Sequence, residues 1–365
     1  PADTGAGTEP RTRLHFISAG LHPDYLQAPG AALAGRALSP VEFDGRELGA
    51  EDFRRIRAPM RELMVLGGMM ANKADVQALF NRWRTRAGFM RSAQLLMRYA
   101  RDRLRHPRGT RLVLGNALVA RLLTSLRDAG VDIRFDHRLV KLLHAQGRVG
   151  GAVFEVAGRR ETLPGRCGVV LATGGIGHDE ALRGALAPAG AHRYSLACES
   201  VRGEGIAAAR RAGAAFERHR GDFFWQPVSR VPHAGGAPGL FPHLYLDRAK
   251  PGLIAVDGQG PRFVDEGASY HHFVEGMLAA GGAQAPAYLI CDADFVRRYG
   301  LGVIPPGLVA GSRHETGGYL IVAQTLDVLA QRLGLDGETL RITVARHNEA
   351  ARAGNDPELH KGETP

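Results

Sequence analysis

The sequence is poor in cysteine and lacks long apolar runs. Its 365 residues include three cysteines, Cys167, Cys198 and Cys291, and no two of them form a CxxC pair. This spacing indicates neither a disulfide framework nor a zinc site, so we expect no bound metal. No apolar run approaches the roughly 18 residues of a membrane span, and the first residues lack the apolar core of a signal peptide. We therefore expect a cytoplasmic protein without a membrane span.

Lysine is also scarce, although the chain is basic. The formal net charge is +10, and arginine supplies nearly all the cationic side chains because only four lysines are present. Much of this charge lies on helical patterns such as residues 98–111, and aromatic residues do not interleave a basic stripe as they do in single-strand binders. We interpret the arginines as a solvated surface and expect no nucleic-acid partner.

The dinucleotide-binding fingerprint GxGxxG is absent. The run GAGTEP at 5–10 lacks the third glycine and a following helix. A different glycine-rich segment, LATGGIG at 171–177, follows the apolar run at 168–172, which is typical of a buried parallel strand. Glycines let backbone N–H groups approach an anion, so this turn is compatible with a phosphate. A purely structural strand-to-loop turn has the same pattern.

The residues around this turn predict alternating helices and strands. Residues 73–105 are helical in pattern, and residues 115–130 form a cleaner amphipathic helix that ends at Gly130. Residues 131–156 alternate and break at Gln146-Gly147, which predicts strand, turn and strand. Helix, strand pair and buried strand in that order fit the second half of a doubly wound α/β nucleotide-binding domain.

The ends of the chain differ from this middle. Residues 1–60 are rich in glycine and proline, which indicates extended connections lying on a larger body. The composition changes again near residue 206, where we place a domain boundary. Beyond it the sequence predicts a small-residue helix from 206, a hairpin over 253–266 that turns at Asp257-Gly258, and amphipathic helices at 325–335 and 337–354.

Five stretches together resemble one family. They are RGTRLVLGNALVARLL at 108–123, GVVLATGGIG at 168–177, LDRAKPGLIAVDGQGPRFVDEGASYHHFVEGM at 246–277, YLICDADFVRRYGLG at 288–302 and TVARHNEAARAGNDPELHKGE at 343–363. In this order they resemble the FAD-dependent fumarate reductase and succinate dehydrogenase flavoprotein superfamily, especially its 3-ketosteroid 1-dehydrogenase-like branch. No single stretch is specific.

The resemblance implies an incomplete doubly wound α/β FAD-binding domain with a smaller α+β capping domain. The chain resembles the middle of such an enzyme, without the amino-terminal GxGxxG unit and without the segment that closes over the flavin. The implied domains are a partial FAD-binding domain at 1–205, a capping and substrate domain at 206–355, and the start of the return to the FAD domain at 356–365.

The resemblance also implies positions that contact FAD. Backbone at Leu139 would touch the adenine, and the turn at 172–175 would lie along the nucleotide. Gly203-Glu204-Gly205 corresponds to a GDG segment near the flavin, with glutamate in place of aspartate, and a strand-to-helix turn is the alternative explanation for its glycines. The expected cofactor-binding residues are Leu139, Ala172, Thr173, Gly174, Gly175, Gly203, Glu204 and Gly205.

One tyrosine stands where the steroid dehydrogenases have their base. Tyr270 follows the RFVDE stretch, and the resemblance gives it the removal of the proton beside the ketone. Because a free tyrosine is a weak base, it needs a lowered pKa or a relay. His271 or His272 would relay, and at most one faces the site if this segment is extended. We expect His271 and Phe273 to contact substrate.

Other polar residues of this region have structural explanations. We interpret Arg262 and Glu266 as an ion pair that fixes the end of the hairpin. The relatives that reduce fumarate carry an arginine where this chain has Tyr270, so its loss argues against a dicarboxylate substrate. His233, His243 and Asp292 also lie in family-like stretches and remain weaker candidates.

The leading hypothesis is an FAD-dependent oxidoreductase acting on a CH–CH bond beside a ketone in an apolar, steroid-like small molecule. Tyr270 would be the base and flavin N5 the hydride acceptor. A fumarate or enoate reductase-like flavoprotein is the first alternative, and a truncated non-catalytic fragment or pseudoenzyme is the second. The sequence leaves the electron acceptor and the reaction direction open.

Overall fold

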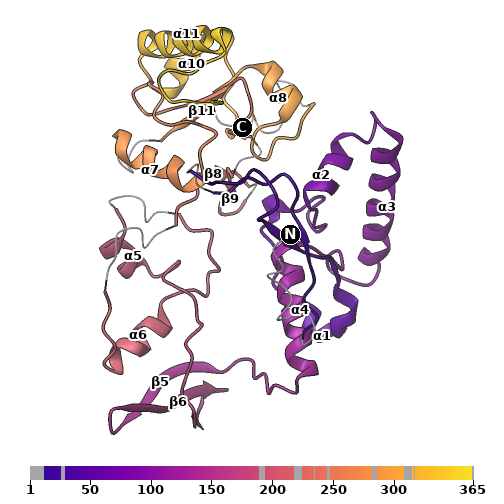
Figure 1. Cartoon of the computed structure of the whole chain (residues 1–365), viewed down its shortest axis with the longest axis vertical. Helices are drawn as coiled ribbons and strands as arrows, with labels where there is room; N and C mark the ends of the chain where they lie inside the picture. Colours follow the sequence, from indigo (N-terminus) through magenta and orange to yellow (C-terminus); the bar gives the residue numbers. More distant parts are fainter. Residues whose placement is uncertain are drawn as a thin grey trace.

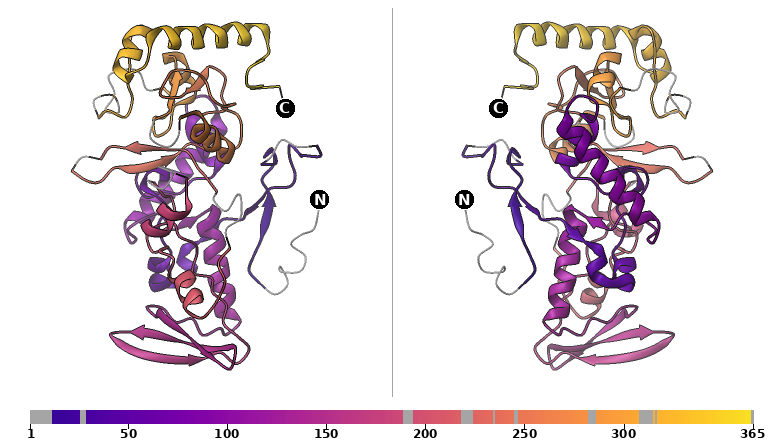
Figure 2. Two further views of the ribbon diagram at one scale, coloured as in Figure 1. Left: turned by 90° about the vertical axis from the view of Figure 1, so that its left-hand side faces the viewer. Right: turned by 90° about the vertical axis from the view of Figure 1, so that its right-hand side faces the viewer.

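The computed structural model describes residues 12–25, 29–188, 194–217, 224–233, 235–244, 247–281, 286–307, 315 and 317–363. The molecule is elongated. Helices α1 to α4 lie along one side, the carboxy-terminal helices gather at one end, and strands β5 and β6 lie at the opposite end (Figure 1). The last helix, α11 (Gly337–Ala353), extends across the end where the carboxy-terminal helices gather (Figure 2).

The amino-terminal part combines short strands with four helices. Its elements are β1 (Phe16–Ser18), β2 (Leu38–Pro40), β3 (Phe43–Asp44), the 3-10 helix η2 (Gly45–Leu48), α1 (Gly49–Arg55), the 3-10 helix η3 (Arg61–Leu63), α2 (Lys73–Phe80), α3 (Arg86–Arg103), β4 (Arg111–Leu112) and α4 (Leu114–Asp128). Strand β1 pairs with β2 and β3 pairs with β4, both antiparallel. The helices expected at 73–105 and 115–130 are therefore present, the first as two helices.

An apolar core holds the amino-terminal strands on α4. Phe43 of β3 and Phe53 of α1 are buried with Leu112 and Ala117. The expectation that residues 1–60 lie on a larger body agrees with this packing. Helix α1 was not predicted, because its seven residues present one apolar contact, Phe53, and the helical period is too short to recognise.

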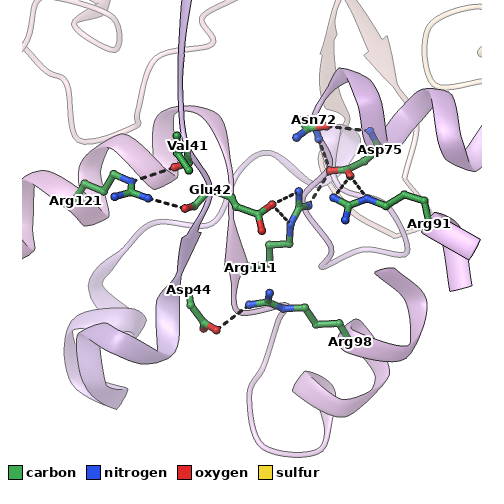
Figure 3. Close-up of polar contacts among 9 residues, drawn as sticks. All are labelled: Val41, Glu42, Asp44, Asn72, Asp75, Arg91, Arg98, Arg111 and Arg121. Atoms are coloured by element: carbon green, nitrogen blue, oxygen red, sulfur yellow. Dashed lines mark hydrogen bonds and ion pairs between the residues drawn. The ribbon is translucent and has the colours of Figure 1, made fainter. Parts of the chain in front are cut away.

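Ion pairs also join helices α2 and α3 to strand β4. The Asp75 carboxylate at the start of α2 is fully buried and binds Arg91 of α3 at 2.8 Å and Arg111 of β4 at 2.7 Å (Figure 3). Arg111 also binds Glu42 at 2.5 Å. These pairs join α2, α3 and β4. Burial would raise the pKa of Asp75, but the backbone N–H of Asn72 and the two guanidinium groups hold it below its usual value.

The middle part contains a three-stranded antiparallel sheet and two short helices. Its elements are β5 (Arg138–Ala145), β6 (Arg148–Val156), β7 (Arg159–Pro164), α5 (Glu180–Leu186) and α6 (Glu204–Arg211). The predicted turn at Gln146-Gly147 joins β5 to β6, and both residues have positive φ, as a tight hairpin turn requires. The first strand begins at Arg138 rather than at 131.

The buried parallel strand expected at 168–172 is absent. These residues carry no strand, and the side chain of Val170 is 91% exposed. A parallel strand is stabilised by hydrogen bonds to neighbouring strands, and every strand pair among the described residues is antiparallel and lies elsewhere. The apolar run therefore lies on the surface as an unpaired segment.

The carboxy-terminal part is α+β. Its elements are β8 (Val228–Val231), β9 (Gly239–Pro242), β10 (Leu253–Val256), α7 (Tyr270–Gly281), β11 (Tyr288–Cys291), α8 (Ala293–Tyr299), α10 (Leu326–Leu333) and α11 (Gly337–Ala353). The predicted hairpin at 253–266 is wrong in its partner. The chain does turn after Asp257, but β10 pairs with β11 and only the bridge Val256–Arg262 continues toward 266.

The two carboxy-terminal helices cover the β10–β11 pair. Leu340 of α11 is fully buried with Val256 of β10 and Ile290 of β11, in a cluster that we call the cap core: Ile254, Val256, Ile290, Ala330, Leu335 and Leu340. The helices expected at 325–335 and 337–354 are thus confirmed. Asp336 caps the start of α11 through the Thr339 N–H at 2.8 Å, which sets the sharp junction between them.

Candidate functional site

A buried ion-pair network anchors the chain just before Tyr270. Arg262 binds Glu266 through two hydrogen bonds of 2.9 Å and Asp356 through bonds of 3.1 and 2.8 Å. Lys361 lies 3.1 Å from the Glu266 carboxylate, and Glu266 also accepts the Ala255 N–H at 2.9 Å. The predicted pair Arg262–Glu266 is therefore confirmed as structural, since both side chains are nearly inaccessible and occupied by each other.

Arg248 fixes the loop that leads into α7. Its guanidinium is buried and donates to the carbonyls of Glu266 at 2.8 Å and Ala268 at 3.1 Å, and to the His243 carbonyl at 2.8 Å. Burial lowers the pKa of Arg248 to about 10, because nearby carboxylates offset the desolvation only in part. Arg248 thus holds the backbone of Glu266 and Ala268, which lies just before α7, in one conformation.

Tyr270 is the first residue of α7 and lies in a group of rings. Its ring meets Tyr25 edge-on at 4.8 Å between centroids and Phe224 at 5.4 Å, and Phe224 stacks on His271 at 5.2 Å. We call Tyr25, Phe224, Tyr270 and His271 the aromatic cluster. Three distant sequence segments thus converge on the predicted base.

The two histidines follow helical geometry, which corrects the extended conformation assumed from sequence. The His271 Nδ1 accepts the backbone N–H of Trp225 at 3.2 Å, and Nε2 lies 3.4 Å from Glu275. His272 is more exposed and lies 3.9 Å from the same carboxylate. Only His271 belongs to the aromatic cluster, and a substrate contact for His271 stays a prediction.

Sequence reasoning missed Tyr25. Its hydroxyl oxygen accepts the backbone N–H of His271 at 3.1 Å. Burial raises the pKa of Tyr25 to about 12, and a hydrogen bond with Tyr270 adds to that rise. The surrounding stretch, SAGLHPDYLQ, has no periodicity that would single the tyrosine out. The hydroxyl therefore stays protonated at neutral pH beside the predicted base.

Phe273 lies on a different surface from Tyr270. It is buried, meets Phe263 at 5.4 Å and lies under the Arg248 guanidinium at 4.8 Å. It also lines a cavity of about 690 Å³ inside the carboxy-terminal part, together with Ile254 and Leu289. Tyr270 and Tyr25 do not line this cavity. A substrate contact for Phe273 stays a prediction, and its place is one helical turn from the aromatic cluster.

Two predicted cofactor segments lie against each other. Gly203 has φ +73° and starts α6, and Gly205 is buried so closely against Thr173 that a Cβ would collide with its Oγ1. Gly174 has φ +80°, and a Cβ there would lie 3.2 Å from Val201. The close approach requires glycine at both positions. The turn at 172–175 and the start of α6 therefore form one surface.

The chemistry of this surface suits part of a nucleotide. Residues 172–175 are exposed backbone without bulky side chains, and the amino-terminal end of α6 adjoins them. Glu204 at the helix start and Asp179, whose Oδ2 lies 2.9 Å from where a Gly203 Cβ would stand, place carboxylates beside it. Carboxylates suit sugar hydroxyls better than phosphates.

Leu139 lies in β5, which packs against α6. Arg211 at the end of α6 donates to the carbonyl of the next residue, Val140, at 3.3 Å. The three predicted cofactor segments are therefore contiguous through α6. They lie in the part of the molecule with α5 and α6, which stands between α7 and strands β5 and β6 in the view of Figure 1. Their contact with FAD stays a prediction.

Two of the weaker candidates, His233 and Asp292, take structural roles. His233 binds Glu62 at 2.8 Å, and Asp292 caps α8 through the Phe295 N–H at 2.7 Å. Among the described residues, no group of three or more His, Cys, Asp or Glu side chains is arranged to hold a metal ion. None of the described helices combines the length and apolarity needed to cross a bilayer.

Comparison with known proteins places the chain among flavoprotein dehydrogenases. The chain is 34% identical over 366 residues to the 4-oxocyclohex-2-ene-1-carboxylate 5-dehydrogenase of Sinomonas cyclohexanicum, covering 98% of this chain and 61% of the relative. It is 31% identical over 359 residues to the 3-oxosteroid 1-dehydrogenase of Mycolicibacterium smegmatis, covering 93% and 60%. The chain thus spans about three fifths of the length of these relatives.

A solved structure supports the fold. The chain matches a 3-ketosteroid delta1-dehydrogenase from Sterolibacterium denitrificans, in complex with 1,4-androstadiene-3,17-dione, with a TM-score of 0.81 and 28% identity over 98% of this chain and 65% of that one. The predicted α/β flavoprotein fold is thereby confirmed. The model of the FAD binding domain family matches residues 19–365. The chain therefore belongs to the FAD binding domain family, among flavoprotein oxidoreductases that include the 3-oxosteroid 1-dehydrogenases.

Proposed function

We propose that this chain supplies the substrate cap and part of the flavin site of a dehydrogenase that introduces a double bond beside a ketone in a cyclic, apolar small molecule. The observation that carries the proposal is the aromatic cluster, in which Tyr25 and Tyr270 from distant segments bring two hydroxyl-bearing rings together. The similarity to dehydrogenases of cyclic ketones supports the same chemistry.

The two tyrosines divide the acid and base roles. The pKa of Tyr25, raised to about 12, keeps its hydroxyl protonated, so it donates a hydrogen bond. Tyr270 lies beside this donor, and we assign to it the removal of the carbon-bound proton. Phe224 packs edge-on against Tyr270 and stacks on His271, while Phe224 itself is 62% exposed. FAD, when bound, supplies the acceptor for the hydride.

The charge of the cluster favours a ketone over a dicarboxylate. Its four members carry no arginine, and the nearby Arg248 and Arg262 are already engaged with backbone carbonyls and carboxylates. A dicarboxylate needs bidentate cationic partners. The carboxylate named in the Sinomonas cyclohexanicum relative keeps a small oxocyclohexane acid as a second candidate substrate beside a steroid. A fumarate or enoate reductase is less well supported.

We keep the domain boundary at residue 206 as part of this proposal and move the second boundary, expected at 356, toward the carboxy terminus. Asp356 and Lys361 are tied to Arg262 and Glu266, so the segment after 355 is attached to the cap through its charged residues. We infer that the cap includes this segment at least as far as Lys361.

The test uses the full-length flavin-loaded protein and a cyclic ketone, offered both as a 3-ketosteroid and as an oxocyclohexane carboxylate. Tyr270→Phe should lower kcat by about 100-fold or more, because proton transfer by a positioned base contributes at least that much, with unchanged flavin content. Tyr194→Phe, at a tyrosine that is 45% exposed, is the matched control. Wild-type turnover by the Tyr270 variant would remove it from the mechanism, and no turnover of either ketone would favour the non-catalytic alternative.

A further inference from the structure

A hydrogen-bonded chain of four side chains lies at the cavity of the carboxy-terminal part. The Asp247 Oδ2 lies 2.6 Å from His243 Nδ1, and His243 Nε2 lies 2.8 Å from Ser229 Oγ. The Ser229 hydroxyl in turn lies 2.8 Å from the Tyr319 hydroxyl. Aspartate, histidine and serine thus stand in line, with His243 and Asp247 on one segment and Ser229 on strand β8.

The directions of these hydrogen bonds follow from the carboxylate. Burial alone would raise the pKa of Asp247, but the bond from His243 and two backbone N–H groups lower it below its usual value. The ionised carboxylate accepts, so His243 carries its proton on Nδ1 and accepts at Nε2. Ser229 then donates to Nε2, and the Tyr319 O–H donates to Ser229. Ser229 therefore has its proton directed at a base.

The surroundings hold this geometry in place. Arg248 N–H binds Asp247 Oδ1 at 2.9 Å and Gly302 N–H binds Oδ2 at 3.1 Å, so the carboxylate cannot rotate freely. The Phe241 ring lies edge-on to His243 at 5.3 Å. Asp247 and His243 are 6% and 7% exposed, which shields their contact from water. A serine nucleophile needs a base that is held in this orientation, and the base in turn needs a carboxylate to orient it.

The cavity provides room for a reacting group. Its volume is about 690 Å³, which is within the range of small-molecule sites. Ser229, His243 and Tyr319 lie on its wall, while Ile254, Phe273 and Leu289 give it an apolar lining. Asp247 is not part of the wall and acts through His243. An apolar ester carbonyl placed at Ser229 would also lie near the Tyr319 hydroxyl, which can turn its one proton from Ser229 Oγ to the developing oxyanion once the serine oxygen attacks.

We propose that Ser229, His243 and Asp247 form a second, flavin-independent site that cleaves carboxylic esters with an apolar acyl group. Ser229 Oγ attacks the carbonyl carbon and passes its proton to His243 Nε2. The bond from carbon to the alcohol oxygen breaks, and the leaving alcohol takes the proton from His243. Water, deprotonated by His243, then attacks the acyl-serine, and the carboxylic acid leaves with Ser229 restored. Asp247 is a positioning residue that fixes the imidazole tautomer.

The test needs no flavin and does not depend on the dehydrogenase proposal. The purified chain is incubated with an alkyl fluorophosphonate, which transfers its phosphonyl group to an activated serine with release of fluoride. Intact mass and peptide mapping should show one phosphonyl group on Ser229. Absence of labelling at Ser229, or equal labelling of other serines, while chymotrypsin is labelled in parallel, overturns the proposal.

Variants separate chemistry from folding. His243→Gln should slow the labelling of Ser229 by at least 100-fold, and Ser229→Ala should abolish both labelling and hydrolysis of p-nitrophenyl butyrate. Asp247→Asn should give a labelling rate that rises with hydroxide concentration instead of levelling off, since the wrong tautomer no longer accepts the proton. Asp336→Asn, at the cap of α11 and away from the cavity wall, is the control and should label as wild type. Equal labelling in His243→Gln and wild type contradicts the relay.

Discussion

The carboxy-terminal part and the region of the glycine turn differ in how their apolar and charged groups are satisfied. In the first, Val256 and Leu340 are completely buried, and the charge of Glu266 is met by Arg262 and Lys361. In the second, Val170 is 91% exposed and residues 172–175 lie at the surface. In the carboxy-terminal part, contacts within the described residues bury these groups. In the region of the glycine turn, apolar and backbone groups stay exposed, and a ligand or another segment would cover them.

The largest expected difference concerns the flavin. We expect residues 1–365 alone to bind FAD weakly. The turn at 172–175 and the start of α6 form a glycine-containing surface, but the GxGxxG motif is absent from this sequence. The measurement is the visible flavin absorbance that remains after desalting. Stoichiometric bound flavin would show that the exposed region is a complete site.

Removing the buried carboxylate tests the closed region. Glu266→Ala removes the carboxylate partner of Lys361 and one of the two carboxylate partners of Arg262 in a buried site. We therefore expect a loss of about 3–5 kcal/mol in the free energy of unfolding. Urea denaturation measures it. The matched control is Glu338→Ala, which breaks the exposed pair with Arg341 and should cost at most about 1 kcal/mol. Equal losses in both variants would mean that the network does not hold the cap.

A glycine substitution tests whether the turn at 172–175 packs tightly against the start of α6. Gly205→Ala places a Cβ against Thr173, so we expect a loss of about 1–3 kcal/mol. Gly184→Ala, in α5 with no heavy atom near the added Cβ, should instead stabilise by up to about 1 kcal/mol. Urea unfolding curves of the two variants compare them. A neutral Gly205→Ala would show that turn and helix do not pack as described.

The smallest effect is a dependence of stability on pH. Burial would raise the pKa of Glu266, but Arg262 and Lys361 hold it below its ordinary value of 4.5. A carboxyl with a depressed folded-state pKa stabilises the protein above the unfolded pKa, and this contribution is lost as the pH falls below about 4.5. Glu266→Gln should therefore flatten the unfolding free energy between about pH 5 and pH 3. An unchanged slope would place the acid sensitivity elsewhere.

Local patterns predicted many elements but not their partners. The helices at 114–128 and 326–353 and the turn at Gln146-Gly147 were predictable because helical period, caps and glycine positions act over a few residues. The strand expected at 168–172 and the hairpin at 253–266 were wrong because strand formation depends on which distant segment supplies the hydrogen bonds. Apolar runs alone do not name that segment.

The candidate site shows the same limit. Tyr270 and the pair Arg262–Glu266 were identified from one continuous stretch. Tyr25 and Phe224 were not, because their contacts with Tyr270 join residues far apart in sequence. His243 was named as a weaker candidate, but its hydrogen bonds to Asp247 and Ser229 were not predicted. The rings and the hydrogen bonds that give these groups chemical meaning exist only after the chain is folded.

The sequence by itself determined the family, the positions of the glycines that need unusual backbone angles, and the ionic partners within one turn of chain, because those depend on local sterics and on motifs in order. The tertiary structure alone decided that Tyr270 begins a helix beside Tyr25, that β10 pairs with β11, and that Asp356 and Lys361 complete the network at Glu266. These outcomes depend on burial and on pairing between distant segments, whose free energy no local pattern contains.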